Sequence, residues 1–310
     1  MMRFAAFWLI CCGAIVANAQ VPIQWSSDLR AGVARAQRTL HPILFYVSGD
    51  RDNDDNDLDN LQKRALRDRL VKAIVDARYV ALRLPRSNQN KELLRTLGAP
   101  VGFGAYLLVV TPEGKRVALI PPFSVADPEK LVELLTSAFH EYRGGLFDKQ
   151  IRPVLEDEEA SATNVRRALS LVREFIIVQA DDAIIELLQR EDLDKGLRKS
   201  AYDTLARIST KKGVKELFEA ALTDEDAAAA LRKCTPTAAE QMLDELDWRE
   251  PERMLVAYNA VTRICHITGT KPARFWESAD GRKKLDELDR VRDLVRKEAA
   301  EWEETYARVR

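Results

Sequence analysis

The first half of the chain alternates short apolar runs with longer stretches in which apolar residues recur every three or four positions. The short runs are rich in β-branched and aromatic residues and are too short for helices, so they predict strands at 42–47, 79–84, 105–110 and 116–120. The longer stretches each have one apolar face and predict helices at 26–40, 57–76, 90–97 and 127–142. This order predicts an α/β fold with a mixed central sheet.

The connections between these runs set the expected strand directions. Strands separated by helices predict parallel pairs in the centre of the sheet. The short turn Thr111-Pro112-Glu113-Gly114 instead predicts an antiparallel hairpin between the last two strands. The final strand is therefore expected at an antiparallel edge.

From residue 161 onward the pattern predicts helices only, arranged in pairs. The pairs begin at Val165, Leu197, Asp224 and Glu252, so their starts recur with a loose period along the chain. A period of roughly 30 residues in helix pairs is typical of an α-solenoid. An irregular helical bundle is the alternative.

The join between the two parts is marked by helix-breaking and acidic residues. Gly144 and Gly145 follow the last helix of the α/β part, and Pro153 and the acidic run 156–159 come next. We therefore expect a domain at 20–145, a linker at 146–160 and a helical domain at 161–310.

Both parts resemble known families. The element order of residues 20–145, together with the strand and the Thr-Pro-Glu-Gly-Lys turn at 105–115, resembles the thioredoxin fold, in which this strand follows a cis-proline. The helix at 251–261 and the phrases at 198–201 and 166–169 resemble helices of HEAT repeats. The resemblance implies a thioredoxin-like domain followed by a HEAT-like α-solenoid.

The thioredoxin-like domain lacks the residues that carry redox chemistry in that family. Such chemistry needs a Cys-x-x-Cys motif after the first central strand, where a helix N-terminus lowers the pKa of the attacking thiol. Residues 48–51 are Ser-Gly-Asp-Arg at that place, and no cysteine occurs between residues 20 and 233. Ala105 stands where the family has its cis-proline, and Pro100 lies five residues upstream. We predict a redox-inactive domain with no catalytic residue and no cofactor.

Residues 1–19 have the pattern of a secretory signal peptide. Arg3 supplies a positive charge, residues 4–16 are almost wholly apolar, and Ala17-Asn18-Ala19 is a cleavage site of the A-x-A type. The apolar run is shorter than the roughly 20 residues that span a bilayer. We expect cleavage, a periplasmic or extracellular location and no stable membrane anchor afterwards. An uncleaved anchor is the alternative.

Charge and cysteine content narrow the possible partners. The 48 Lys and Arg residues balance 49 Asp and Glu residues, so the chain has no basic footprint for nucleic acid. Removal of residues 1–19 leaves two cysteines, Cys234 and Cys265. In an oxidising compartment they could form a disulfide, and otherwise they would be small buried hydrophobic residues.

An acidic loop follows the first predicted strand. Residues 50–59 contain six Asp and two Asn, and Asp50, Asp52, Asp54 and Asp57 are candidate ligands of a weak calcium site. The EF-hand pattern fails, because the Gly and the final Glu that it requires are absent. We favour a solvated loop whose carboxylates complement the N-terminus of the next helix.

Together these features favour an exported, non-catalytic scaffold that binds another protein through the surface of its helical repeats. Two alternatives stay open. The chain could be a thiol-redox or enzyme-accessory protein that uses Cys234 and Cys265. It could also bind a surface in a calcium-dependent way through the loop at 50–59.

Overall fold

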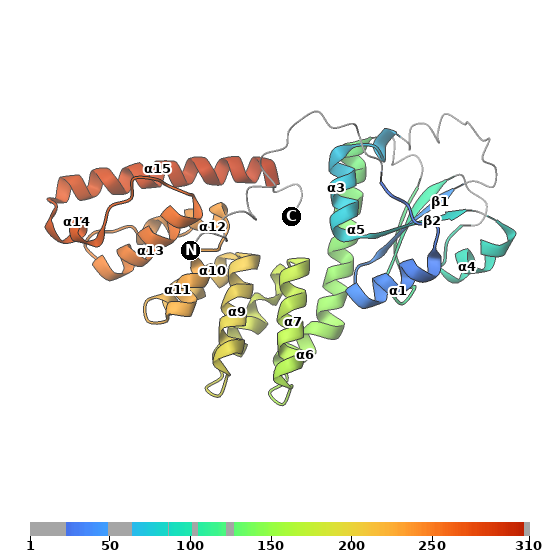
Figure 1. Ribbon diagram of the computed structural model, residues 1–310, viewed down its shortest axis with the longest axis horizontal. Helices are drawn as coiled ribbons and strands as arrows, with labels where there is room; N and C mark the ends of the chain where they lie inside the picture. Colours follow the sequence, from blue (N-terminus) through green and yellow to red (C-terminus); the bar gives the residue numbers. More distant parts are fainter. Residues whose placement is uncertain (1–22, 49–63, 86, 101–104, 122–126, 307–310) are drawn as a thin grey trace, which may run out of the picture. The chain divides into compact units, whose positions relative to one another are not determined.

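The computed structural model describes residues 23–48, 64–85, 87–100, 105–121 and 127–306 (Figure 1). The chain divides into two compact units, Met1–Tyr142 and Arg143–Arg310. The described part of the first unit combines a four-stranded sheet with helices, and the described part of the second is helical. The predicted signal peptide at 1–19 and the acidic loop at 50–59 lie outside the described residues.

Helices and strands alternate in the described part of the first unit. In chain order these elements are α1 (Leu29–Thr39), β1 (Ile43–Ser48), α3 (Arg69–Arg78), β2 (Val80–Pro85), α4 (Lys91–Thr96), β3 (Tyr106–Val110), β4 (Arg116–Ile120) and α5 (Pro128–Leu146). A 3₁₀ turn, Asn88–Asn90, precedes α4. The strands confirm the prediction from the apolar runs to within one residue at each end.

The sheet is mixed and has the strand order β2-β1-β3-β4. β1 pairs in parallel with β2 and antiparallel with β3, so that Ile43 lies beside both Val80 and Val110. β3 and β4 form the expected antiparallel hairpin. The prediction of parallel central strands is therefore wrong for β3. To pair in parallel with β1, β3 would need a connection from β2 that carries the chain back along the full length of the sheet. The helix in that connection, the six-residue α4, is only about 9 Å long.

Aspartate caps set where two helices of this unit begin. Asp28 precedes α1 and accepts a hydrogen bond from the backbone N–H of Ala31 at 2.9 Å. Asp68 accepts the N–H of Leu70 at 2.8 Å and starts α3 at Arg69. The predicted single helix at 57–76 is therefore wrong, because this cap places a new helix start inside it.

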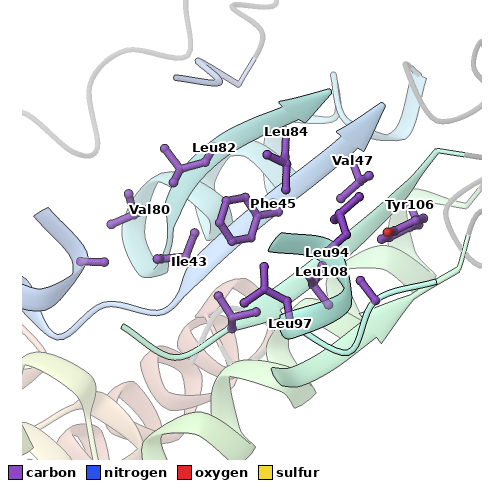
Figure 2. Close-up of a cluster of buried hydrophobic side chains, with 13 residues drawn as sticks. Ile43, Phe45, Val47, Val80, Leu82, Leu84, Leu94, Leu97, Tyr106 and Leu108 are labelled. Atoms are coloured by element: carbon purple, nitrogen blue, oxygen red, sulfur yellow. The ribbon is translucent and has the colours of Figure 1, made fainter. Parts of the chain in front are cut away.

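Helices lie on both faces of the sheet (Figure 1). Alternate residues of β1, β2 and β3 point to one face, where they pack with residues of α1 and α4 in one hydrophobic cluster (Figure 2). Gly32 brings α1 close to β2, since a Cβ atom at this position would lie 2.3 Å from Leu82 Cδ2. The intervening strand residues, among them Leu44 and Leu107, are also buried and point to the other face.

Helices make up nearly all of the described second unit. After the last turn of α5 come a π-helical turn (Phe147–Ile151), α6 (Arg152–Glu156), α7 (Ala162–Phe175), α8 (Asp181–Leu188), α9 (Lys195–Ile208), α10 (Lys211–Ala221), α11 (Glu225–Leu231), α12 (Pro236–Glu240), α13 (Pro251–Ile264), α14 (Ala273–Ser278) and α15 (Gly281–Tyr306). Short 3₁₀ turns occupy Val178–Ala180 and Leu243–Glu245.

The segment 146–160, predicted to be a linker, is mostly helical instead. Gly144 and Gly145 lie inside α5, which runs through the π-helical turn into α6. Pro153 is the second residue of α6, which directly follows the π-helical turn, so the helix continues through it. Four apolar side chains of the segment are buried: Leu146, Phe147, Ile151 and Leu155. Burial of this apolar stripe therefore outweighs the weak helix propensity of glycine and proline.

The helices of the second unit follow one another as hairpins (Figure 1). α7 packs against α9 and α9 against α11, while α8 packs against α6, α9 and α10. Left-handed backbone conformations at Ile176 and Ser209 end α7 and α9, so these two hairpins turn at equivalent positions. The first helices of the pairs begin within three residues of the predicted starts. The short α14 has no counterpart among the predicted helices.

Candidate interaction surface

Ion pairs join consecutive hairpins of the second unit at a regular sequence spacing. Lys212 of α10 pairs with Asp182 of α8 across 30 residues. Lys233 Nζ lies 2.7 Å from Asp203 Oδ1 of α9, again across 30 residues. These exposed pairs add little to stability. They show, however, that corresponding positions of neighbouring hairpins meet about one predicted repeat apart.

Arginine side chains bind the turns between hairpins through backbone carbonyl groups. Arg190 donates to the carbonyl oxygens of Leu155 and Asp157 at 2.7 and 3.1 Å. Arg198 donates to those of Leu188 and Arg190 at 2.9 and 3.1 Å. The last carbonyl groups of a helix have no partner inside it, so these guanidinium donors satisfy them and fix the turns.

Arg253 links α13 to two earlier elements. Its Nη atoms donate to both carboxylate oxygens of Glu219 on α10, at 2.8 and 3.0 Å, and its Nε donates to Glu245 at 2.8 Å. The guanidinium carbon lies 4.9 Å from the centre of the Phe218 ring. Hydrogen bonds from Arg253 also lower the pKa of Glu219 below its ordinary value. This bidentate geometry holds the two helices in one register.

An open cleft of about 720 Å³ lies between the turns that precede α9 and α11. Its walls are charged, and Lys199 Nζ of one wall lies 2.6 Å from Asp226 Oδ1 of the other. Asp224, on the second wall, caps α11 by accepting the backbone N–H of Asp226 at 2.8 Å. These groups already satisfy one another, and sites for small molecules are mostly apolar. The cleft is therefore a poor candidate for a small-molecule site.

A second groove, of about 570 Å³, lies between α15 and the segment 243–249. We call it the Trp248 groove, and its residues are Leu243, Asp244, Leu246, Asp247, Trp248, Arg249, Leu285, Asp289, Arg292 and Arg296. The four residues of α15 are spaced by four, three and four positions, so they form one line along the helix. Nothing in the periodicity of the sequence indicated this groove.

The Trp248 groove combines apolar and basic groups. Trp248 is half-buried, and Lys284 Nζ lies 5.8 Å from the centre of its ring. Leu285 is 44% exposed. Arg292 fixes the wall by donating to the carbonyl oxygen of Leu246 at 2.6 Å and to Asp289 at 2.8 Å. The groove thus has a wall fixed by hydrogen bonds and a mostly charged lining in which Leu285 is an exposed apolar residue.

A buried polar network holds α13, α14 and α15 together. Tyr258 donates to Glu287 at 2.7 Å, and Arg290 donates to both oxygens of that carboxylate at 2.8 and 2.9 Å. The Tyr258 and Trp276 rings pack edge to face, with centroids 4.9 Å apart. Burial raises the pKa of Tyr258 to about 12. Rings packed this closely leave no space for a ligand, so the network is structural.

Cys234 and Cys265 are buried thiols in the structure rather than a disulfide. Cys234 follows α11 and Cys265 ends α13. Burial, with a contribution from Glu298, raises the pKa of Cys265 to about 12. A thiol with this pKa is almost fully protonated near neutral pH and is a poor nucleophile.

The position of the missing redox motif is described only in part. Ser48, its first residue, ends β1 and is buried, whereas Asp50, Asp52, Asp54 and Asp57 lie outside the described residues. No cis peptide bond occurs among the described residues. The carbonyl oxygen of Pro100 accepts a hydrogen bond from the Tyr106 hydroxyl at 2.9 Å. Pro100 therefore lies near the start of β3 without a cis bond.

Within the described part of the chain, no group of three or more His, Cys, Asp or Glu side chains is placed to hold a metal ion. The helices described there are also too short or too polar to cross a membrane. In comparisons with known proteins, no family model, curated protein or solved structure matches the chain.

Proposed function

We propose that the chain is an exported, non-catalytic scaffold that binds another protein through its helical unit. In this proposal a thioredoxin-like domain without redox thiols is joined to a HEAT-like α-solenoid. The observation that carries it is the regular joining of consecutive helical hairpins by the ion pairs Asp182–Lys212 and Asp203–Lys233, which have the same sequence spacing. Such stacks present extended surfaces that suit protein partners.

The first unit supports the thioredoxin-like part of the proposal. Its mixed sheet lies between α1 and α4 on one face and α3 and α5 on the other, in the element order on which the resemblance rests. The absence of cysteine from residues 20–233 removes thiol–disulfide exchange from this domain. A fold of this kind then serves as a scaffold or binding module.

Neither alternative function gains support from a specific observation. A redox role for Cys234 and Cys265 would require an accessible thiol of low pKa, and both side chains are buried. Calcium binding by residues 50–59 rests on composition alone, since the loop lies outside the described residues.

Affinity capture from the exported fraction tests the proposed function. The full-length chain carries a C-terminal tag and is crosslinked to its neighbours before purification and mass spectrometry. We expect one protein to be enriched reproducibly, with crosslinks to lysines of the helical unit such as Lys211 and Lys215, which are exposed. A chain whose signal residues 1–19 are deleted stays in the cytoplasm and is the matched control.

Two results would contradict the proposal. Repeated capture without any enriched protein would argue against a scaffold. A partner whose crosslinks fall only on lysines of the first unit, such as Lys91 or Lys115, would remove the helical unit from the interaction.

A further inference from the structure

A continuous stretch of helix connects the two compact units. The division between the units falls inside α5, between Tyr142 and Arg143. The helical path then continues through the π-helical turn into α6. The chain passes from one unit to the other only here, so a change in their relative orientation has to bend or twist this connection.

Each end of the connection is fixed to its own unit. On the side of the first unit, Leu135 is fully buried, and the Tyr142 hydroxyl donates a hydrogen bond to the carbonyl oxygen of Leu40. On the side of the second unit, Phe147 and Ile151 are buried, and the π-helical turn and α6 pack against α7. Bending is therefore confined to the few residues between these anchors.

Gly144 and Gly145 lie between the anchors. Both are half-buried, and a Cβ atom at either position would have no atom of the described chain within 4 Å, apart from neighbouring backbone of its own helix. Alanine would therefore fit at both positions, so packing does not account for the two glycines. Glycine is less stable than alanine inside a helix, because it loses more conformational freedom on folding. The pair thus weakens the helix at the junction of the units.

The backbone that follows the glycines departs from regular α-helix. Residues 147–151 form the π-helical turn, and Pro153 has no backbone N–H to donate to the turn before it. Glycines, π-helical turns and prolines are the usual causes of bends in helices. Such π-helical turns are also frequent at functional sites. All three features fall within ten residues of the division between the units.

Arg143 restrains the bend at this point. Its guanidinium Nη1 donates to the carbonyl oxygens of Phe175 and Ile176 at 3.3 and 2.9 Å, where α7 ends. Arg143 precedes the glycines, whereas α7 comes after them, so the side chain spans the weak part of the helix. A long side chain of this kind limits the amplitude of a bend without fixing the backbone.

We propose that Gly144 and Gly145 are a hinge that lets the two units change their relative orientation, and that Arg143 limits its range. Hinges of this kind consist of a few residues that absorb a change of backbone angles while the packed elements on either side stay intact. The hinge goes beyond the proposed scaffold function and does not depend on which partner is bound.

Double electron–electron resonance on the full-length chain measures the distribution of distances between the units. Arg35 of α1 and Lys211 of α10 are exposed, and each is replaced by p-acetylphenylalanine, whose ketone takes a spin label without involving the cysteines. We expect a broad distribution for the labelled chain without further changes. Gly144→Ala combined with Gly145→Ala should narrow it about twofold, because alanine stabilises the helix at both positions. Arg143→Met should widen it.

Gly281→Ala is the matched control. It makes the same chemical change in α15, where a Cβ atom would lie 3.8 Å from the Trp248 ring, an ordinary contact distance. This variant should leave the width unchanged, and urea unfolding checks that each variant is folded. Equal widths with and without the two alanines, or equal narrowing by Gly281→Ala, would overturn the hinge. An unchanged width in folded Arg143→Met would overturn the restraint assigned to Arg143.

Discussion

Glu287 is a buried carboxylate that is paired with the Arg290 guanidinium and accepts a hydrogen bond from the Tyr258 hydroxyl. Burial alone would raise its pKa, but the hydrogen bonds from Arg290 and Tyr258 outweigh burial, and the pKa lies below its ordinary value of 4.5. A carboxyl group with a lowered folded-state pKa stabilises the fold above its unfolded pKa. That stabilisation is lost as the pH falls through the folded pKa.

We therefore predict that Glu287→Gln lowers the free energy of unfolding by about 1–3 kcal/mol at neutral pH, because charge-assisted hydrogen bonds are lost in a buried site. The difference from wild type should shrink below about pH 4.5. Urea unfolding at several pH values measures both effects. Glu277→Gln, on the exposed side of α14, is the control and should change little. A pH-independent difference would contradict the role assigned to the Glu287 charge.

Cys265 has a raised pKa of about 12, mainly because it is buried. We predict that iodoacetamide at about pH 8 labels neither Cys265 nor Cys234 in the folded chain, since a thiolate must form and be reached. Both should react fully once urea unfolds the protein. Thr268→Cys, at an exposed position, is the positive control. Rapid labelling of the folded chain would favour the redox alternative, and resistance after unfolding without a reductant would indicate a disulfide.

At the scale of the element, aspartate and threonine caps set the helix starts of the second unit. Asp194 accepts the backbone N–H groups of Gly196 and Leu197 at 2.9 and 3.1 Å and so starts α9. We predict that Asp194→Ala lowers the free energy of unfolding by about 0.5–2 kcal/mol. The exposed Asp192, two residues earlier, supplies the control Asp192→Ala. Equal losses for the two variants in urea unfolding would refute a specific capping role.

The elements that sequence reasoning predicted well are those whose signal is local. The apolar runs 42–47 and 79–84 and the hairpin turn at 111–114 depend on neighbouring residues only, and they appear in the structure as expected. The direction of β3 was mispredicted because it depends on how far α4 can carry the chain. The helix at 152–156 was not predicted, because a proline usually ends a helix. Proline is tolerated in the first turn of a helix, and the sequence does not show that Pro153 has that position.

At the scale of the whole molecule, the Trp248 groove is a feature that local sequence patterns do not predict. The helical character of the second unit and the starts of its helix pairs could be predicted from the recurrence of apolar positions. The Trp248 groove could not be predicted, because the segment 243–249 and α15 are distant in the sequence and line one groove only in the folded chain. The signal for this groove in the sequence is Trp248 itself, a large aromatic residue that lies between two charged residues and outside the predicted helices.

The division into two compact units predicts that each unit has its own stability. Leu82 lies in the sheet core of the first unit and Leu205 in α9 of the second, and both are fully buried. Replacing either by alanine removes buried apolar volume and should cost about 2–5 kcal/mol in its own unit. Hydrogen exchange measured by mass spectrometry shows which of the two units loses stability.

We expect Leu82→Ala to speed amide exchange in peptides from 23–121 and to leave those from 162–306 unchanged, and Leu205→Ala to do the reverse. Peptides of α5 are set apart, because that helix crosses the division between Tyr142 and Arg143. Each variant serves as the control for the other, since both make the same chemical change at a fully buried leucine. If either variant speeds exchange equally in both sets of peptides, the chain unfolds as one cooperative body and its two parts do not function as separate modules.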